Sequence, residues 1–421
     1  MESYVFFFDE SFHDRKIRVN KNGTMNILRE DCLDNYVGVF WGCKRKELNK
    51  YIEALELFES RQKEIYGLSK EQELKSTVIS KKNFKYGLRS FNKQTYSFYY
   101  DLFSLLEFMQ PIIQIELISK MEYYLRNVFS AGKFNGIEPN ISTFYYVLTK
   151  SILTYHNKEL IEALYDTTDR EKAEKFRKLL IFNYKCIIDA IQGIERKETE
   201  LEAMNEIVFL LSSVTFVDTP KREYDFPYFV NFEGLTKLLE EKDVDIDLTD
   251  IIIDEEQKTL DSSKAYGFQN VSFNKSDEKI ELRLSDWIAS FVGRMIFAIV
   301  SDKGLNEDSV IDIRDVAKND LETKRYLSSN WFDLKERDFE LYQLLYQVFI
   351  IEQGSYWSTM TFSYADQAIL FYTLIRYFNK YETFEDYRKI DNQQHAIEYN
   401  KDVLIELEYT FENMVWGGEP Q

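Results

Sequence analysis

The sequence contains few cysteines, prolines and glycines, and each shortage excludes a class of protein. Its three cysteines, Cys32, Cys43 and Cys186, are odd in number and lack the paired spacing of metal ligands, so they indicate neither a disulfide framework nor a zinc site. Five prolines and fifteen glycines in 421 residues are too few for a linker-rich or disordered chain. We therefore expect a folded protein in a reducing, cytoplasmic compartment.

Long apolar runs are also missing. No run approaches the roughly 20 residues that span a bilayer, and the first three residues carry none of the basic charge that opens a secretion signal. The chain has no Gly-rich phosphate loop either, which argues against hydrolysis of nucleoside triphosphates. We expect no contact with a membrane.

The charge is strongly negative but unevenly spread. A net charge of −19 argues against a protein that coats DNA without regard to sequence, because neutralising phosphates requires basic surface. Residues 1–110 nevertheless hold 18 basic and 16 acidic residues, whereas the remainder holds 35 basic and 56 acidic residues. The first quarter of the chain therefore differs from the rest.

One stretch of that first quarter, residues 74–100, has no acidic residue. Its basic residues are Lys75, Lys81, Lys82, Lys85, Arg89 and Lys93. They alternate with six aromatic residues, namely Phe84, Tyr86, Phe91, Tyr96, Phe98 and Tyr99. The pattern is typical of a nucleic-acid path, in which bases stack on aromatic rings and phosphates contact cations. The alternative is a basic segment docked onto the acidic remainder of the same chain, with its aromatic residues filling a core, and charge alone does not separate the two.

Periodicity predicts an α/β fold at the beginning of the chain. Apolar and β-branched runs predict strands at residues 3–8, 16–19 and 36–41, which together suggest an antiparallel three-stranded meander, and a further strand at 112–118. Helical spacing predicts an amphipathic packing helix over residues 44–66.

The rest of the chain divides into three parts. Residues 120–225 show helical periodicity and are expected to form a helical insertion, after which residues 226–304 return to the α/β core with strands at 248–253 and 268–273. A helix is expected over 284–300. Residues 305–421 hold 11 basic and 22 acidic residues and are expected to be an acidic, all-helical C-terminal region. Residues 1–119, which precede these three parts, are expected to form the first part of the α/β core.

Three carboxylates mark apolar elements of this core. Asp9 and Asp254 end predicted strands, and Asp286 lies on the predicted helix, where an unpaired charge would be costly. Two Mg²⁺ ions held by such carboxylates would activate a water and stabilise the leaving oxygen in phosphodiester hydrolysis. Each carboxylate has an alternative role as a turn or helix cap. Glu10 follows Asp9 on a strand, so its side chain should point to the opposite face.

Four short motifs, in this order, resemble the domain of unknown function 3800 family, which is regarded as RNase H-like and is predicted to be nucleolytic. They are Phe-Asp-Glu-Ser at residues 8–11, Glu-Leu-Lys at 73–75, Ile-Ile-Ile-Asp-Glu at 251–255 and Leu-Ser-Asp-Trp-Ile-Ala at 284–289. The resemblance covers residues 1–119 and 226–304, about half of the chain. It implies an RNase H-like mixed sheet with flanking helices, interrupted by the helical insertion.

The resemblance also implies roles for individual residues. Asp9 would be the central ligand of Mg²⁺ or Mn²⁺, Asp254 the ligand from a later strand, and Asp286 the ligand that closes the site from its helix. Glu73 would be a further ligand or would orient water, while Lys75 would contact phosphate or hold Glu73. The sequence departs from the family pattern at Ser285 and Ser290, which are tolerable changes, and at Trp287, which is bulkier than the usual aliphatic residue.

The function expected from these features is two-metal hydrolysis of DNA or RNA. His13 is a weaker candidate for a general base because it lies four residues after Asp9. Two alternatives stay open: a non-catalytic protein-interaction module, and a nuclease subunit of a bacterial defence or mobile-element system that needs a partner. In the nuclease interpretation, the acidic C-terminal region would cover the basic stretch as an autoinhibitor or would bind a protein partner. In the interaction module, the acidic surface and the helices would bind other proteins.

Overall fold

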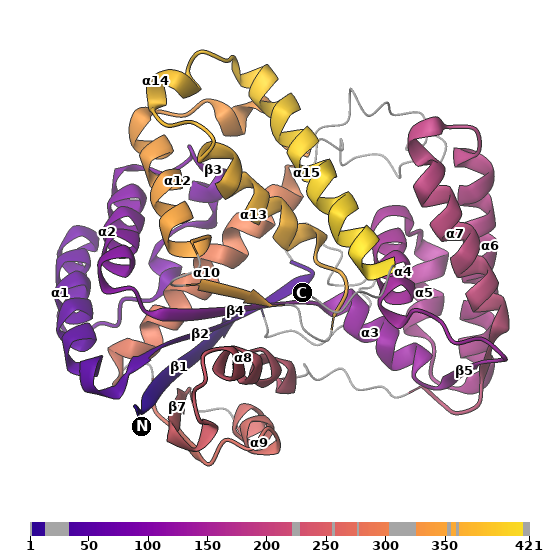
Figure 1. Ribbon diagram of the computed structural model, residues 1–421, viewed down its shortest axis with the longest axis horizontal. Coiled ribbons are helices and arrows are strands. Elements are labelled where there is room, and N and C mark those ends of the chain that lie inside the picture. Colours follow the sequence, from indigo (N-terminus) through magenta and orange to yellow (C-terminus); the bar gives the residue numbers. More distant parts are fainter. Residues whose placement is uncertain are drawn as a thin grey trace.

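The computed structural model describes residues 2–12, 33–220, 228–254, 257–275, 278–302, 326–351, 355–358 and 362–415. In these residues a six-stranded mixed sheet is covered by helices on both faces (Figure 1). The expectation of an α/β fold with a mixed sheet and flanking helices is therefore confirmed. Figure 1 shows α1, α2, α10 and α12 on one side of the sheet and α8 and α9 on the other.

The strand order in the sheet is β8-β7-β1-β2-β4-β9. Strands β1, β2 and β4 are antiparallel neighbours, β7 and β8 run parallel to β1, and β9 runs parallel to β4. The bounds are β1 Tyr4–Ser11, β2 Asn35–Lys44, β4 Ile112–Ser119, β7 Thr249–Ile253, β8 Asn270–Phe273 and β9 Ser355–Ser358.

The predicted meander is wrong in its order. β1 pairs directly with β2, which was expected as the third strand of the meander, and the strand expected at residues 16–19 lies outside the described residues. The third antiparallel strand is instead β4, which pairs Ile115 with Val39 of β2. Apolar runs predict that strands exist but carry no information on which strands pair.

β1 is buried on both faces, as expected for a central strand with a parallel neighbour. Val5 and Phe7 point into the main hydrophobic core, whereas Phe6 and Phe8 belong to a smaller core beneath α8. The ring of Phe7 stacks on Trp41 of β2 with centroids 4.9 Å apart. The alternation continues to the end of the strand and therefore decides where the polar residues after Phe8 point.

The helix α10 (Ile280–Ser301) packs across β1 and β2. Three hydrogen bonds to backbone carbonyls hold the helix in place. From the helix, Ser285 Oγ donates to Phe7 O at 3.0 Å and Trp287 Nε1 to Leu74 O at 2.8 Å. From β2, Trp41 Nε1 donates to Glu281 O of the helix at 2.6 Å. Among the described helices, α10 alone is long and apolar enough to cross a membrane, but 78% of its apolar window is buried inside the protein. That burial is typical of a core helix.

The helices around the sheet form two layers. On the α10 side lie α1 (Leu48–Tyr66) and α2 (Lys93–Met109), joined by a segment that contains the short strand β3 (Lys85–Leu88). On the other side lie α8 (Phe229–Glu241) and α9 (Gln257–Ala265). The packing helix predicted over residues 44–66 corresponds to α1, but the predicted helix begins four residues before the observed one.

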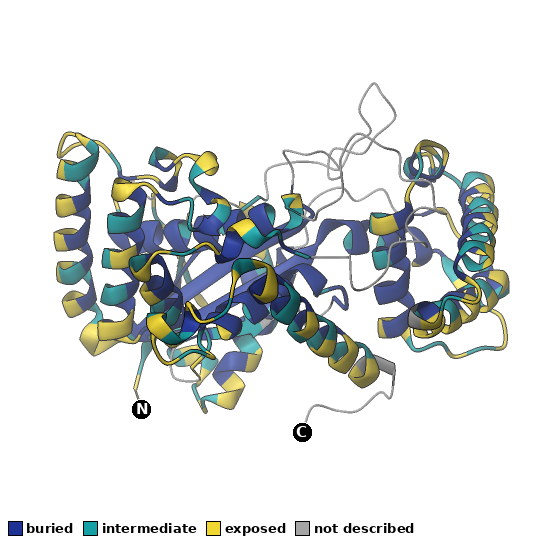
Figure 2. Ribbon diagram, turned by 90° about the horizontal axis from the view of Figure 1, so that it is seen from above, coloured by how far each residue is buried: buried dark blue, intermediate teal, exposed yellow. Residues whose placement is uncertain are grey.

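Residues 120–225 have a hydrophobic core of their own, formed by side chains between Met121 and Phe216 together with Tyr364. Figure 2 shows their helices at one end of the molecule with the buried sides facing one another. A two-stranded ladder joins the beginning and end of this part, so it is not purely helical. The elements are α3 Lys120–Phe129, β5 Gly132–Phe134, α4 Ile141–Tyr155, α5 Lys158–Tyr165, α6 Arg170–Ile191, α7 Glu198–Ser213 and β6 Val214–Phe216.

The C-terminal region is neither all-helical nor separate from the core, which corrects the expectation for residues 305–421. Its strand β9 completes the sheet beside β4, and the ring of Phe349 contacts Phe103 of α2 with centroids 5.5 Å apart. Four residues of strand are too short to show a period. The helices are α12 Glu336–Phe349, α13 Asp366–Phe378, α14 Phe384–Tyr387 and α15 Asn392–Val415.

This region also packs against part of the basic stretch. Arg89 forms an ion pair with Asp333 at 2.5 Å, and Arg337 donates to the carbonyl of Phe91 at 3.3 Å. Gly87 has a φ of +57°, and a Cβ added there would lie 2.5 Å from both Trp331 and the hydroxyl of Tyr342. At Arg89, therefore, the second interpretation holds, in which the basic stretch is docked onto the acidic remainder of the same chain.

We predict that Gly87→Ala destabilises the protein more than Gly67→Ala does. Both glycines have positive φ, so both substitutions incur a backbone cost of about 1–2 kcal/mol. Only Gly87 meets neighbouring side chains, which adds about 1–3 kcal/mol of overpacking, whereas a Cβ at Gly67 has nothing within 4 Å. Urea unfolding of the two variants measures the difference, and equal losses would show that the C-terminal region does not pack on β3.

Candidate functional site

The carboxylates of Asp9 and Asp254 lie at the same edge of the sheet. Phe8 and Ile253 pair across the parallel strands β1 and β7, so the residues that follow them are level. Alternation places Asp9 on the same face as Phe7, and Asp254 on the same face as Ile252, and both apolar residues contact the core under α10. Glu10 belongs to the opposite face. The two aspartates therefore point toward α10.

Asp286 comes from α10 and is held in a fixed position. Its two carboxylate oxygens accept hydrogen bonds from the backbone N–H and the hydroxyl of Ser76, at 3.1 and 3.0 Å. Ser76 begins the short 3₁₀ helix η3 (Ser76–Val78) and is itself buried. This contact ties the Glu-Leu-Lys motif of residues 73–75, which directly precedes Ser76, to the helix.

Burial raises the pKa of Asp9 well above its usual range, and the negative charges of Asp286 and Asp254 raise it further. The backbone N–H of Glu10, at 2.8 Å, and the charge of Lys75 act in the opposite direction. The three aspartates therefore share one electrostatic environment, in which negative charge is only partly compensated.

Burial also raises the pKa of Asp286, although the two hydrogen bonds from Ser76 and the charge of Arg294 lower it. The charge of Glu73 raises this pKa, so Glu73 lies within electrostatic reach of the helix. Glu73 forms an ion pair with Lys75 at 3.2 Å, and this partner is the first cause of the raised pKa of Lys75. Asp286 and Asp254 contribute to the same shift. All four carboxylates singled out in the sequence thus belong to one group.

This group does not form a closed metal coordination shell. In the part of the chain that the structure describes, no three His, Cys, Asp or Glu side chains lie close enough together to hold one ion. The carboxylates are instead bonded to protein donors: Asp286 to Ser76, Asp9 to its neighbouring amide and Glu73 to Lys75. His13 and Glu255 lie outside the described residues.

The residues still suit a hard divalent cation. Mg²⁺ and Mn²⁺ prefer carboxylate oxygens, and this edge of the sheet supplies them from two strands and a helix. The raised pKa of Asp9 reflects mutual repulsion between carboxylates as well as burial, and a cation placed among them would relieve that repulsion.

The basic stretch does not provide the aromatic stacking surface that was expected. Phe84, Phe91, Phe98 and Tyr99 are buried in the main core, so for these four residues the stacking interpretation is wrong. The sequence pattern is the same for a core and for a platform, because both place aromatic side chains on one face.

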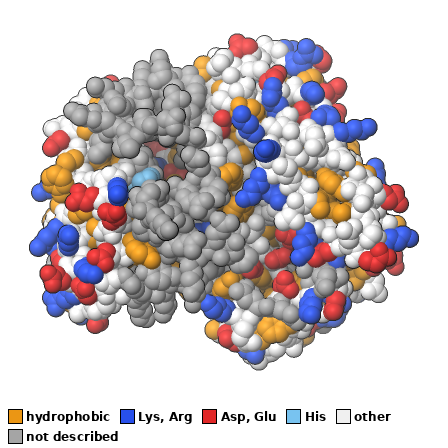
Figure 3. Space-filling model, turned by 180° about the vertical axis from the view of Figure 1, so that it is seen from behind, with side chains coloured by type: hydrophobic (Ala, Val, Ile, Leu, Met, Phe, Trp, Pro, Cys, Tyr) orange, Lys and Arg blue, Asp and Glu red, His pale blue; other side chains and the backbone are white. Residues whose placement is uncertain are grey.

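The basic side chains of this stretch have different surroundings. Lys82, Lys85 and Lys93 are exposed, Arg89 is paired with Asp333, and Lys75 is paired with Glu73. Lys81 lies over two aromatic rings, those of Phe12 and Phe297. Figure 3 shows the face seen from behind, where several Lys and Arg side chains gather to the right of the middle, among uncharged and hydrophobic side chains.

Sequence reasoning missed two residues of the site. Ser76 follows Lys75 directly, but nothing in the sequence separates it from other serines, and Phe12 carries no motif. Gly293 and Arg294 follow Asp286 on α10 by seven and eight residues. This helical spacing is a sequence signal that places them near Asp286 on the helix surface. Arg294 donates to the carbonyl of Ile79 at 2.9 Å, which anchors the basic stretch to α10.

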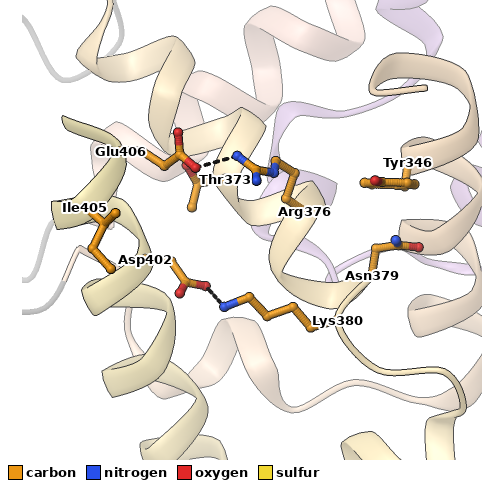
Figure 4. A pocket seen from close by; sticks show the side chains of 8 residues that line it. All are labelled: Tyr346, Thr373, Arg376, Asn379, Lys380, Asp402, Ile405 and Glu406. Carbon is orange, nitrogen blue, oxygen red and sulfur yellow. Dashed lines mark hydrogen bonds and ion pairs between the residues drawn. The ribbon is translucent and has the colours of Figure 1, made fainter. Parts of the chain in front are cut away.

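A second polar cluster forms a cavity of about 330 Å³ between α12, α13 and α15 (Figure 4). Figure 4 shows Arg376 turned toward Glu406 and Lys380 toward Asp402, and each forms an ion pair. The cavity therefore has no excess of either charge, and it shares no residue with the carboxylate group. Its ion pairs hold α13 against α15.

No protein-family model, no curated protein and no solved structure matches this chain. The resemblance to the domain of unknown function 3800 family therefore depends on the four sequence motifs alone and stays a prediction.

We predict that Asp9→Asn stabilises the protein at neutral pH. The pKa of Asp9 is raised in the folded state, so the folded protein binds a proton more readily than the unfolded chain, and stability contributed by this group falls as pH rises through that interval. Removing the charge should raise the free energy of unfolding at pH 7–8 by about 0.5–2 kcal/mol, as is common for destabilised functional sites. The gain should fall to a few tenths of a kcal/mol at about pH 4, where the carboxyl is protonated in the folded state and about half protonated in the unfolded chain.

Asp34→Asn is the matched control. Asp34 is also buried, but its two oxygens accept hydrogen bonds from Ser119 Oγ at 2.6 Å and from the Met121 N–H at 2.9 Å. An amide replaces one acceptor with a donor, so this variant should lose about 1–3 kcal/mol. Urea unfolding from pH 4 to 8 measures both variants, and a loss of stability in Asp9→Asn at neutral pH would show that Asp9 is a structural cap.

Proposed function

We propose that this protein is a metal-dependent nuclease that hydrolyses phosphodiester bonds of DNA or RNA, and that its α/β core is RNase H-like. The observation that carries the proposal is the convergence of Asp9, Asp254 and Asp286 at one edge of the sheet, where burial and mutual repulsion raise the pKa of Asp9. A cytoplasmic location belongs to the proposal, since the few cysteines suit a reducing compartment.

The sheet topology supports the RNase H-like assignment. Three antiparallel strands, β4, β2 and β1, are followed by two strands parallel to the first, β7 and β8, which is the order such a core requires. Asp9 lies near the carboxyl end of β1, and Asp254 directly follows β7, the parallel neighbour of β1. Ligands of open α/β sheets bind at such ends. The strand β9 and residues 120–225 are additions to this core.

Divalent ions bound to the carboxylates would supply Lewis acidity and an activated water for attack on phosphorus. The residues of the protein fix the positions of the carboxylate oxygens. Asp9 and Asp254 present oxygens from rigid strands, and Asp286 is oriented by two hydrogen bonds from Ser76. Lys75 reaches the group with a positive charge and is 56% exposed, so it can contact a phosphate while it holds Glu73.

A nuclease subunit that depends on a partner is the second candidate, and the net charge of −19 favours it. A strongly acidic protein repels nucleic acid over most of its surface, and a basic partner would supply the missing attraction. Metal binding by the purified chain without cleavage of any substrate would support this candidate. Absence of both would leave the non-catalytic interaction module.

We predict that the wild-type protein binds Mn²⁺ and cleaves DNA or RNA, and that Asp9→Asn, Asp254→Asn and Asp286→Asn each lose both properties. Each loss of cleavage should reach at least about a hundredfold, because even residues that only support a metal ligand cost 10- to 100-fold. Isothermal titration of Mn²⁺ measures binding, and labelled single-stranded and duplex DNA and RNA measure cleavage.

Asp166→Asn is the control for this experiment. Asp166 is an exposed aspartate that pairs with Lys172 at 2.9 Å, within residues 120–225, and its substitution should leave binding and cleavage unchanged. Failure of the wild-type protein to bind metal at millimolar concentration, with nucleic acid present, would remove the nuclease proposal.

A further inference from the structure

Phe12, three residues after Asp9, has an unusual backbone conformation. Its φ is +64°, in the left-handed region that bulky side chains rarely adopt. Strained residues of this kind persist only where the surrounding structure holds them, and they gather at functional sites. Three residues of extended chain span at most about 10 Å, so Phe12 lies beside the carboxylate group.

The position of the Phe12 ring is fixed by α10. A Cβ added at Gly293 would lie 2.3 Å from Cε2 of Phe12, so the ring occupies the space that a side chain at Gly293 would fill. Gly293 follows Asp286 by seven residues and therefore lies on the same face of the helix. The ring is half-buried, and it sits on the helix face that carries Asp286.

Lys81 places a cation at this ring. Its Nζ lies 5.6 Å from the ring centroid of Phe12 and 5.8 Å from that of Phe297, which is one turn beyond Gly293 on α10. Lys81 is exposed and, among the residues the structure describes, its ammonium is in no ion pair. Aromatic rings attract a cation without neutralising its charge. Lys81 is therefore positioned while its full charge stays available to an anion.

We propose that Phe12 and Lys81 form a strand-binding subsite next to the carboxylates, in which a base of the substrate stacks on Phe12 and the adjoining phosphate binds Lys81. The inference rests on the proposed nuclease function and narrows its substrate. A base can stack on a side chain only when it is not stacked in a duplex, so the strand is unpaired at this position. The backbone strain at Phe12 turns the ring toward the bound strand, where an extended continuation of β1 would turn it away.

Two other cations of the basic stretch, Lys75 and Arg89, are less suited to this role. Lys75 is paired with Glu73, and Arg89 is paired with Asp333, so a phosphate would have to displace a carboxylate from either. A similar Lys and Phe pair exists elsewhere, where Lys50 of α1 lies 5.5 Å from the ring of Phe108 of α2. That pair belongs to α1 and α2 and includes no residue of β1, β7 or α10, which carry Asp9, Asp254 and Asp286, so it serves as a control.

Fluorescence anisotropy of labelled oligonucleotides, with chelator present so that they stay intact, tests the subsite in the full-length protein. The probes are single-stranded DNA and RNA 15-mers, the corresponding duplexes, and single strands with one abasic position moved along the sequence. We expect Phe12→Ala to weaken single-strand binding about tenfold, Phe12→Trp to retain it, and Phe108→Ala to leave it unchanged.

The abasic strands test stacking directly. At the contacted position, a missing base should weaken binding to the wild-type protein about tenfold, because the ring of Phe12 then has no base to stack on. The same missing base should have no effect on Phe12→Ala, because that variant has no ring at this position. Lys81→Gln should lower the slope of log affinity against log salt by about 0.7, the value for one phosphate contact to a single strand, whereas Lys50→Gln should leave the slope unchanged.

Phe12→Gly separates binding from folding. Glycine adopts the left-handed conformation without strain, so this variant should melt near the wild-type temperature while single-strand binding is lost. Wild-type affinity in Phe12→Ala and Phe12→Gly, or equal affinity for duplex and single strand, would overturn the subsite and leave the nuclease proposal intact. No binding of any oligonucleotide by the wild-type protein would overturn both.

Discussion

The rest of the structure depends on the packing of α10 across β1 and β2. The helix is buried along nearly its whole length, and Ser285 and Trp287 bond to backbone carbonyls on elements that lie far away in the sequence. These contacts set the rotation and the axial position of the helix together. A rotation by one residue would turn Asp286 away from Asp9 by about 100°. The geometry of the carboxylate group is thus a by-product of core packing.

The sequence was informative wherever an element is long and periodic. β1, β4, α1 and α10 were expected close to their observed bounds, because two-residue and 3.6-residue repeats of apolar side chains are local properties of the chain. The order of strands was not, since pairing joins segments that share no local signal. β9 was missed for a further reason, because its four residues, Ser-Tyr-Trp-Ser, begin and end with a polar residue and form no apolar run.

The same difference between local and long-range signals applies to the residues of the candidate site. Asp9 and Asp254 were found because polar residues that end apolar strands stand out, and Asp286 because it interrupts an apolar helix. The hydrogen bond between Ser76 and Asp286 joins residues 210 positions apart, and no pattern near either residue announces it. In the basic stretch, the error was in the role assigned to the residues. Its aromatic residues were noticed correctly, but alternation with lysine is compatible with an inward face, and four of the six rings point into the core.

The pairing of β9 with β4 joins Ser355 to Ile113, across more than half of the chain. During synthesis the outer edge of β4 is therefore exposed until the last part of the chain has left the ribosome, and an open strand edge is a template for association with other chains. Every proposed ligand precedes residue 302, so the carboxylates and the helix α10 that positions Asp286 are made before the strand that covers β4. A chain cut short before residue 355 would hold all of these ligands but would expose the edge of β4, so its expected defect is association with other chains.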